Sequence, residues 1–390
     1  MFVQLLTYLN HTYHWGFLGV FEYYSTRMVL AFITALLVTI MCGKPFIKKL
    51  YELKVGDRVR AEDCPLLGEL HRDKNNTPTM GGVLLLFALV VSLLLWMDPT
   101  HSFTVMMFIT TLVIGFVGAY DDYLKLRYKN SKGLAGRKKL VIQCLLAAGI
   151  GLYLAVPPLH QPAWPTAPQA KEIHADKVVK TKDYATRLYI PFCKKPVCHL
   201  PILLSVLFSM LVIAGCSNAV NLTDGLDGLS TGTVLFAASA FSLIAFVSNN
   251  FDVANYLNIL YIEGSGEIAI YLAAVAGACL GFLWYNSYPA QVFMGDTGSL
   301  TLGAILGVSA VLLRRECLLA LIGGVFVLEA LSVMIQVGCF KLCNRKRVFL
   351  CAPLHHHFEY KGWPETKVVA RFWIVGLLLA ALGLITLKFQ

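Results

Sequence analysis

The stretch Ser102-Phe-Thr-Val-Met-Met-Phe-Ile-Thr-Thr-Leu-Val-Ile-Gly-Phe-Val-Gly-Ala-Tyr-Asp-Asp122 decides the fold class, because it joins a long apolar run to two adjacent carboxylates. A bilayer core of about 30 Å requires roughly 20 apolar residues in a helix. The run therefore predicts a transmembrane helix over residues 102–120. Its end places Asp121 and Asp122 where hydrocarbon meets water.

Similar apolar runs recur along the whole chain. Hydrophobic residues make up 57% of the 390 residues and charged ones only 14%, which is outside the range of soluble globular proteins. Runs this long are not β-barrel strands, which alternate and need only about 10 residues, so we predict an all-α, polytopic membrane bundle of about ten transmembrane helices. The candidate spans are 24–45, 78–97, 102–120, 138–157, 200–215, 228–249, 267–285, 298–313, 317–340 and 369–388.

The connecting segments differ in charge, and short basic loops stay on the cytoplasmic side of a membrane. Cations gather in alternate loops, which include Lys48, Lys49, Lys54, Arg58, Lys74, Lys125, Arg127, Lys139, Arg345, Lys346 and Lys361. We therefore expect both termini to be periplasmic and the net charge of +10 to reflect orientation and attraction to headgroups or phosphates, with no nucleic acid as partner. The expected cytoplasmic loops of this single domain, 1–390, are 46–77, 121–137, 216–227, 286–297 and 341–368.

The segment 158–199 is expected to be a periplasmic insertion, with a short hairpin near 186–190. Its proline-dense start excludes a regular helix. Cys193 and Cys198 lie in it and could form a disulfide in an oxidising compartment. The first 24 residues have no positive n-region and are expected to form an interfacial helix rather than a cleaved signal peptide.

Asp121 and Asp122 are followed by Lys125, which shares their helical face if the helix continues. A solvated helix end is the plain alternative. Two adjacent carboxylates, however, raise one another's pKa unless a cation or a metal compensates. Oxygen ligands beside a lysine are suited to Mg²⁺ and phosphate chemistry.

Two glycine-rich loops carry further polar residues. Asn221-Leu-Thr-Asp-Gly-Leu-Asp-Gly228 permits close backbone approach to a ligand, although it could also be a simple turn between helices. The loop 286–299 adds Phe293 and Asp296, and Asp296 could either cap the next helix or bind a metal.

Three consecutive histidines, His355 to His357, are uncommon in a loop. A zinc site with Cys339, Cys343 and Cys351 is the rival interpretation, but three adjacent side chains do not all face one small ion. A cluster that faces phosphate or substrate fits better. Glu329 and Gln336, seven residues apart, share a helical face inside a predicted span, where they either pair in the bundle interior or act on substrate.

The order of these motifs resembles a known family. They are Thr77-Pro-Thr-Met-Gly-Gly82, Asp121-Asp122 with Lys125, Asn218-Ala-Val-Asn-Leu-Thr-Asp-Gly-Leu-Asp-Gly228, Asn286 with Tyr288-Pro-Ala-Gln-Val-Phe-Met-Gly-Asp296, and Ala352-Pro-Leu-His-His-His-Phe-Glu359. Over nearly the whole chain they resemble the bacterial phospho-N-acetylmuramoyl-pentapeptide transferases of the polyprenyl-phosphate N-acetylhexosamine-1-phosphate transferase superfamily. The segment 158–199 is longer than this family usually shows.

The resemblance implies an Mg²⁺-dependent enzyme of the bacterial inner membrane with a cytoplasmic active site. Its reaction would transfer phospho-MurNAc-pentapeptide from UDP-MurNAc-pentapeptide to undecaprenyl phosphate, giving lipid I and UMP. A homodimer is expected from the family alone. The resemblance leaves open a UDP-GlcNAc substrate, and the basic loops leave open a lipid-phosphate transporter, although no inverted repeat is visible.

The resemblance also assigns roles to residues, without separating direct attack from a phospho-aspartyl intermediate. The implied catalytic residues are Asp121, Asp122, Asp224, Asp296 and His355, with Asp121, Asp122 and Asp296 as the metal ligands. The implied substrate-binding residues are Lys74, Thr79, Lys125, Asn221, Gly225, Leu226, Asp227, Asn286, Phe293, Gln336, His356 and His357.

Overall fold

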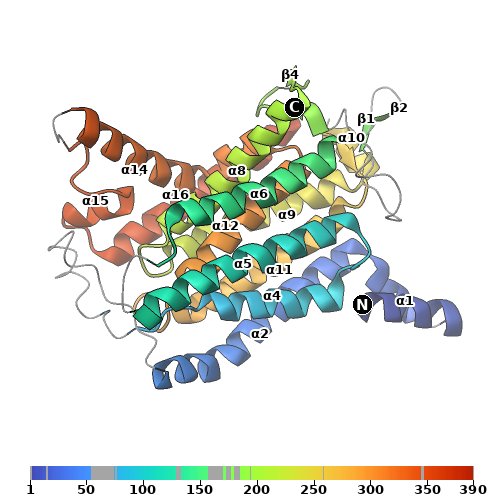
Figure 1. Cartoon of the computed structure of the whole chain (residues 1–390). Helices are drawn as coiled ribbons and strands as arrows, with labels where there is room; N and C mark the ends of the chain where they lie inside the picture. Colours follow the sequence, from blue (N-terminus) through green and yellow to red (C-terminus); the bar gives the residue numbers. More distant parts are fainter. Residues whose placement is uncertain are drawn as a thin grey trace.

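A computed structural model of the chain shows a bundle of long helices (Figure 1). It describes residues 2–14, 16–53, 74, 77–128, 133–156, 170–172, 177–179, 185–193, 195–257, 259–343 and 347–389. Most of the predicted loop 46–77 and much of the predicted insertion 158–199 lie outside these residues.

Each of the ten predicted spans overlaps at least one helix of the structure. Among the described residues, nine helices are long and apolar enough to cross a membrane. The remaining one, α4, has 15 residues, and the structure thus confirms the all-α polytopic class. The helices are α2 (Tyr24–Glu52), α4 (Gly82–Trp96), α5 (Ser102–Tyr128), α6 (Gly136–Ala155), α8 (Ile202–Thr223), α9 (Leu229–Ser248), α11 (Ser265–Asn286), α12 (Gly295–Leu312), α14 (Gly324–Leu342) and α16 (Glu365–Thr386).

Several helix ends differ from the prediction, for local reasons. The helix α4 begins later than residue 78 because Gly81 and Gly82 donate backbone hydrogen bonds to the carbonyls of Phe293 and Met294. The predicted span 317–340 is divided into α13 (Glu316–Ile322) and α14, since the glycine pair at 323–324 weakens helix propagation. Conversely, α5 and α8 continue beyond their apolar runs, so parts of the predicted loops 121–137 and 216–227 are helical.

The helices α11 and α12 form the centre of the bundle. In their most apolar 18-residue stretches, 83% and 89% of the residues are buried, against 22% for α14. Small residues allow this density, since Gly303 and Gly307 of α12 face the backbone of α8, where a Cβ would come too close. The peripheral helices therefore present apolar side chains outward, as expected in lipid.

The two chain ends lie at the same end of the bundle in Figure 1, together with β4 and the short helix α10 (Phe251–Leu257). The expected interfacial region contains α1 (Phe2–Tyr13) and the 3₁₀ helix Gly16–Glu22. A second 3₁₀ helix, Leu387–Phe389, follows α16. The opposite end carries α15 (Leu354–Tyr360).

Short strands belong to the connections between helices. The predicted hairpin near 186–190 is present as β3 (Arg187–Leu188), which pairs antiparallel with β4 (Cys198–His199). Cys193 and Cys198 are both exposed and are not bonded to each other. A second sheet has the antiparallel order β2 (Lys177–Val179), β1 (Ala170–Glu172), β5 (Tyr261–Ile262).

Candidate active site

Three carboxylates from two distant helices meet at one end of the bundle. Asp121 and Asp122 lie near the end of α5, and Asp296 lies in the first turn of α12. One oxygen of each lies within 4.8 Å of those of the other two. Asp296 does not cap α12, because the N-cap position is Met294 and no side chain caps that end.

The close approach of α5 to the start of α12 depends on glycines. A Cβ on Gly118 would lie 2.6 Å from the Cα of Thr297, so only glycine fits this crossing. Gly295 has φ +74°, a left-handed conformation that turns the chain into α12. This geometry lets Asp122 accept hydrogen bonds from the backbone N–H of Asp296 (3.1 Å) and from the N–H and hydroxyl of Thr297 (2.9 and 2.6 Å).

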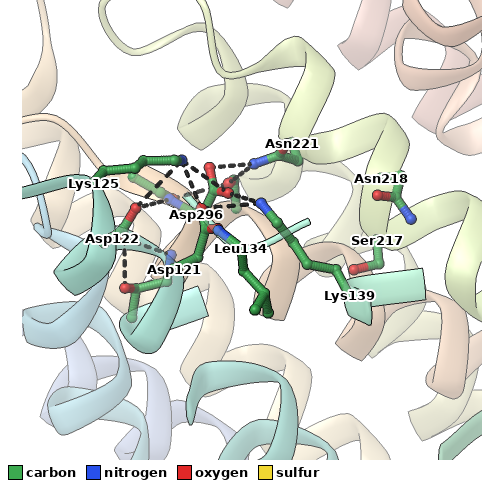
Figure 2. A network of polar contacts seen from close by, with 12 residues as sticks. Asp121, Asp122, Lys125, Leu134, Lys139, Ser217, Asn218, Asn221 and Asp296 are labelled. Carbon is green, nitrogen blue, oxygen red and sulfur yellow. Dashed lines mark hydrogen bonds and ion pairs between the residues drawn. The ribbon is translucent and has the colours of Figure 1, made fainter. Parts of the chain in front are cut away.

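Two lysines bridge the carboxylates (Figure 2). The Nζ of Lys125 lies 2.7 Å from Asp121 Oδ2 and 3.1 Å from Asp296 Oδ2. The Nζ of Lys139, on α6, lies 3.0 Å from Asp121 Oδ2 and 2.7 Å from Asp296 Oδ2. Lys125 thus shares the helical face of Asp121, as predicted. With all groups ionised the cluster keeps a net negative charge, since three carboxylates face two ammonium groups.

Neutral hydrogen-bond donors on α8 and before α6 also contact the carboxylates of the cluster. Asn221 donates to Asp296 Oδ1 (3.0 Å) and to the hydroxyl of Ser299 (2.8 Å). The backbone N–H of Leu134 donates to Asp121 Oδ1 (2.6 Å). Asp296 therefore has one oxygen held by Asn221 and one oxygen, Oδ2, turned to the lysines. The side chain of Asp296 is 15% exposed, whereas that of Asp121 is fully buried.

The turn after α8 places two more carboxylates near the cluster. Burial raises the pKa of Asp224 to about 8, and the negative charges of Asp296 and Asp122 act in the same direction. Asp224 is therefore mostly protonated at pH 7 and can donate a hydrogen bond. Asp227 is held by Lys74 (2.6 Å) and by the backbone N–H of Ala290 (2.9 Å).

Lys74 also contacts Glu365 at 2.6 Å, and Glu365 accepts from the backbone N–H of Asp227 at 2.8 Å. This network ties three chain segments that are far apart in the sequence. Leu226 packs into a small apolar cluster with Leu229 and Val368, whereas Gly225 beside it is exposed. Within this turn, Gly225 and Asp224 are thus the residues most open to a ligand.

The three histidines begin the short helix α15, so their side chains point in different directions. His355 is fully buried, and its Nδ1 lies 3.1 Å from Glu329 Oε2 on α14. Its Nε2 has no hydrogen-bond partner among the described residues, and a Cβ added to Gly225 would collide with it. His355 therefore supports the 224–228 turn from behind.

The other two histidines are more exposed. His356 Nδ1 lies 2.7 Å from Glu359 Oε2. His357 Nδ1 accepts a hydrogen bond from the backbone N–H of Leu350 (3.1 Å). Gln336 does not pair with Glu329 and instead accepts from the backbone N–H groups of Val348 and Phe349.

The remaining predicted site residues surround the start of α12. Asn286 is buried and holds the turn that follows α11, donating to the carbonyl of Val292 (3.0 Å) and accepting from Thr231 (2.8 Å). Phe293 is half-buried, and its backbone pairs with Pro78 and Gly81. The buried Thr79 lies beside Gly295, close to Asp122.

Comparison with known proteins decides the family. The profile of Glycosyl transferase family 4 matches residues 104–314, and phospho-N-acetylmuramoyl-pentapeptide-transferase signature 1 matches residues 74–86. A phospho-N-acetylmuramoyl-pentapeptide-transferase of Protochlamydia amoebophila is 57% identical over 100% of both chains. The chain belongs to the phospho-N-acetylmuramoyl-pentapeptide-transferase family.

Other members of the phospho-N-acetylmuramoyl-pentapeptide-transferase family match at similar length. Those of Thermodesulfovibrio yellowstonii and Desulfotalea psychrophila are 46% and 44% identical, over 96% and 100% of both chains. The resemblance inferred from the motifs is therefore confirmed. The family signature at 74–86 includes Lys74 and Thr79, and the matched profile includes the whole acidic cluster.

The structure adds three residues to the site of this transferase that the sequence did not single out. In the sequence Lys139 indicates only the orientation of the chain in the membrane, yet in the structure it contacts two carboxylates of the cluster. Lys139 lies on the helix that follows the one carrying Asp121, so no helical periodicity in the sequence links the two residues. Thr297 and Glu365 also enter the site network, through Asp122 and Lys74. Thr297 follows Asp296 directly and could have been proposed from that adjacency.

Proposed function

We propose that the protein transfers phospho-MurNAc-pentapeptide from UDP-MurNAc-pentapeptide to undecaprenyl phosphate, giving lipid I and UMP. The names of its full-length relatives support this reaction. The observation that carries it in the structure is the convergence of three carboxylates and two lysines where α5, α6 and α12 meet. Phosphoryl transfer needs positioning and charge stabilisation, which such a cluster supplies.

The three carboxylates fit Mg²⁺. Their oxygens lie close enough together to approach one hard cation, and they are the ligand type that this ion prefers. We propose Asp296 as the main ligand, beside Asp121 and Asp122. Bound Mg²⁺ would neutralise charge on the diphosphate and on the departing UMP.

Side chains of the protein supply the other roles in the proposed reaction. Lys125 and Lys139 attract the oxygens of the phosphate groups. Asp121 and Asp122 each have both oxygens engaged, so we assign proton removal from the lipid phosphate to this adjacent pair without choosing between its members. The freed phosphate oxygen attacks the β-phosphorus, its new P–O bond forms as the bond to UMP breaks, and UMP leaves. A phospho-aspartyl route would instead require one of these two carboxylates to attack the β-phosphorus first and release UMP, before the lipid phosphate attacks in turn.

The turn 224–228 and Phe293 form the proposed uridine side of the site. Gly225 is exposed there, Asp224 offers a hydrogen-bond donor, and Phe293 offers an aromatic face for stacking. His356 and His357 are proposed to meet the sugar and diphosphate. The buried His355 supports the turn through its contact with Gly225.

We place the site on the cytoplasmic face of a bacterial inner membrane. Lys74 and Lys139, which belong to two basic segments of the sequence, contact residues of the site, and short basic loops stay cytoplasmic. Both chain ends lie at the other end of the bundle in Figure 1, as periplasmic termini and an even number of crossings require. A homodimer, expected from the family, can be tested by the mass of the detergent-solubilised protein.

A sugar-nucleotide comparison tests the substrate. Purified protein with undecaprenyl phosphate and Mg²⁺ should release UMP from UDP-MurNAc-pentapeptide and not from UDP-GlcNAc. Release from UDP-GlcNAc alone would move the protein to the other branch of the superfamily. No release from either by folded protein would favour a lipid-phosphate transporter.

A further inference from the structure

The first turns of α16 hold the turn 224–228 by its backbone. Glu365 accepts a hydrogen bond from the N–H of Asp227 (2.8 Å). Trp373, about two helical turns further along α16, donates through its Nε1 to the carbonyl of Gly228 (3.2 Å). An N–H and a carbonyl of the proposed uridine-binding turn are therefore fixed by one helix.

Apolar packing keeps α16 in place beside this turn. Val368 is fully buried and belongs to the same apolar cluster as Leu226. The ring of Trp373 packs so closely on α9 that a Cβ built on Gly232 would lie 2.2 Å from its Nε1. Because this packing leaves no space for even one methyl group, α16 has little freedom to move relative to the turn, and the position of Glu365 is fixed.

The carboxylate of Glu365 joins segments that are far apart in the sequence. Its Oε1 accepts from Lys74 Nζ at 2.6 Å as well as from the N–H of Asp227. Lys74 also contacts Asp227 Oδ1 at 2.6 Å, and Asp227 Oδ2 accepts from the N–H of Ala290 at 2.9 Å. The side chain of Glu365 is only 10% exposed, so water screens these contacts weakly. One carboxylate thus connects the segment before α4, the turn after α8 and the start of α16.

These contacts restrain the side chain of Lys74. A lysine ammonium group has three N–H donors, and Asp227 and Glu365 take one each. Among the residues that the structure describes, no further contact occupies the third donor, which can meet a carbonyl or phosphate oxygen of a nucleotide. Since the two carboxylates already order this long side chain, less conformational entropy is lost when the nucleotide binds.

We propose that Glu365 is a positioning residue for the nucleotide half of the substrate. It acts through Lys74 and through the turn 224–228, and it does not contact the substrate itself. The inference rests on the proposed function, which places the uridine at this turn, and it adds the last helix of the chain to the nucleotide site. Glu365 lies outside both matched family profiles, at 74–86 and 104–314. A role in bundle stability alone is the alternative that the experiments separate.

Glu365→Gln keeps an oxygen that accepts from Asp227 but removes the charge that faces Lys74. The KM for UDP-MurNAc-pentapeptide should rise about tenfold, because a charged hydrogen bond becomes a neutral one. The kcat should change less than about twofold, since a residue that only prepares substrate binding leaves the chemical step unaltered. The KM for undecaprenyl phosphate should stay unchanged. A lower kcat with an unchanged nucleotide KM would overturn the proposal.

Glu263→Gln is the matched control, because it neutralises an exposed carboxylate between β5 and α11 and should leave both KM values unchanged. A double-mutant cycle with Lys74→Met then tests whether Glu365 acts through Lys74. Lys74→Met should itself raise the nucleotide KM, and adding Glu365→Gln should raise it less than about twofold further. Two effects that multiply independently would contradict the proposed route, as would an equal rise in the control.

Equilibrium binding of UDP keeps the test separate from turnover. In calorimetric titrations, Glu365→Gln should bind UDP about tenfold more weakly than the unmodified protein, while a thermal melt shows that it is folded. Equal affinities would overturn the proposal. Unmodified protein that binds UDP but releases no UMP would refute the proposed reaction without altering this comparison.

A second variant keeps the test valid if Glu365→Gln does not fold. Trp373→Phe removes the donor to Gly228 and keeps an aromatic ring. It should weaken UDP binding about threefold, because one neutral hydrogen bond to the turn is lost. An unchanged affinity for UDP in this variant would show that α16 does not position the turn.

Discussion

Replacing Asp296 by asparagine isolates the charge at the centre of the cluster. The amide oxygen can still accept from Asn221. The change removes two charge-assisted contacts of Oδ2, to Lys125 at 3.1 Å and to Lys139 at 2.7 Å. Each lysine keeps a contact with Asp121, at 2.7 and 3.0 Å, so neither is left unpaired.

The expected effects on stability and turnover differ greatly. Each lost contact is worth about 1.5–3 kcal/mol, partly offset by relief of carboxylate repulsion, so folding should weaken by about 1–3 kcal/mol. Turnover should fall at least about 1000-fold, which corresponds to about 4 kcal/mol of transition-state stabilisation. Asp296→Asn should therefore fold, insert and bind detergent normally while releasing almost no UMP.

The assay is UMP release at saturating substrates, with a thermal melt of each preparation. Asp252→Asn is the matched control, since Asp252 is an exposed carboxylate in the first turn of α10, away from the cluster. Its turnover should be unchanged. An Asp296→Asn enzyme that keeps Mg²⁺-dependent turnover within tenfold of the unmodified protein would refute the reasoning.

Three further substitutions probe the rest of the site. Phe293→Ala should weaken binding of UDP-MurNAc-pentapeptide about 5- to 150-fold, because a stacked aromatic ring contributes about 1–3 kcal/mol per base. Unchanged affinity in equilibrium binding would remove Phe293 from the uridine pocket. Gly225→Ala forces a methyl group against His355 and should raise the KM for the nucleotide about tenfold or more. Steady-state kinetics measures this KM, and an unchanged value would contradict the prediction. Lys139→Met leaves Asp121 and Asp296 with Lys125 alone and should lower kcat about 10- to 100-fold; full activity would show that Lys139 is only structural.

The sequence predicts the helices well because each apolar run is long enough to be unambiguous in a bilayer. It misplaces their ends where other forces decide. The start of α4 is set by backbone hydrogen bonds to residues 293–294, which are far away in the chain. The interruption at Gly323 depends on two glycines inside an otherwise continuous apolar run.

The candidate site was predictable where a local motif carried charge into an apolar environment. Asp121, Asp122 and Asp296 stand out for this reason, and the structure brings them together. Lys139 did not stand out, because the membrane orientation of the chain already accounts for a lysine at a helix end in a basic loop. The burial of His355 against Glu329 depends on how α15 packs on α14, which no local pattern encodes.

The most direct test of the central claim is the stoichiometry of UMP and lipid I formed by purified protein from undecaprenyl phosphate and UDP-MurNAc-pentapeptide, with Mg²⁺ and after chelation. We predict equal amounts of both products with Mg²⁺, none after chelation, and recovery when Mg²⁺ is restored. Equal product formation in the chelated sample would contradict a magnesium-dependent acidic cluster as the centre of the reaction.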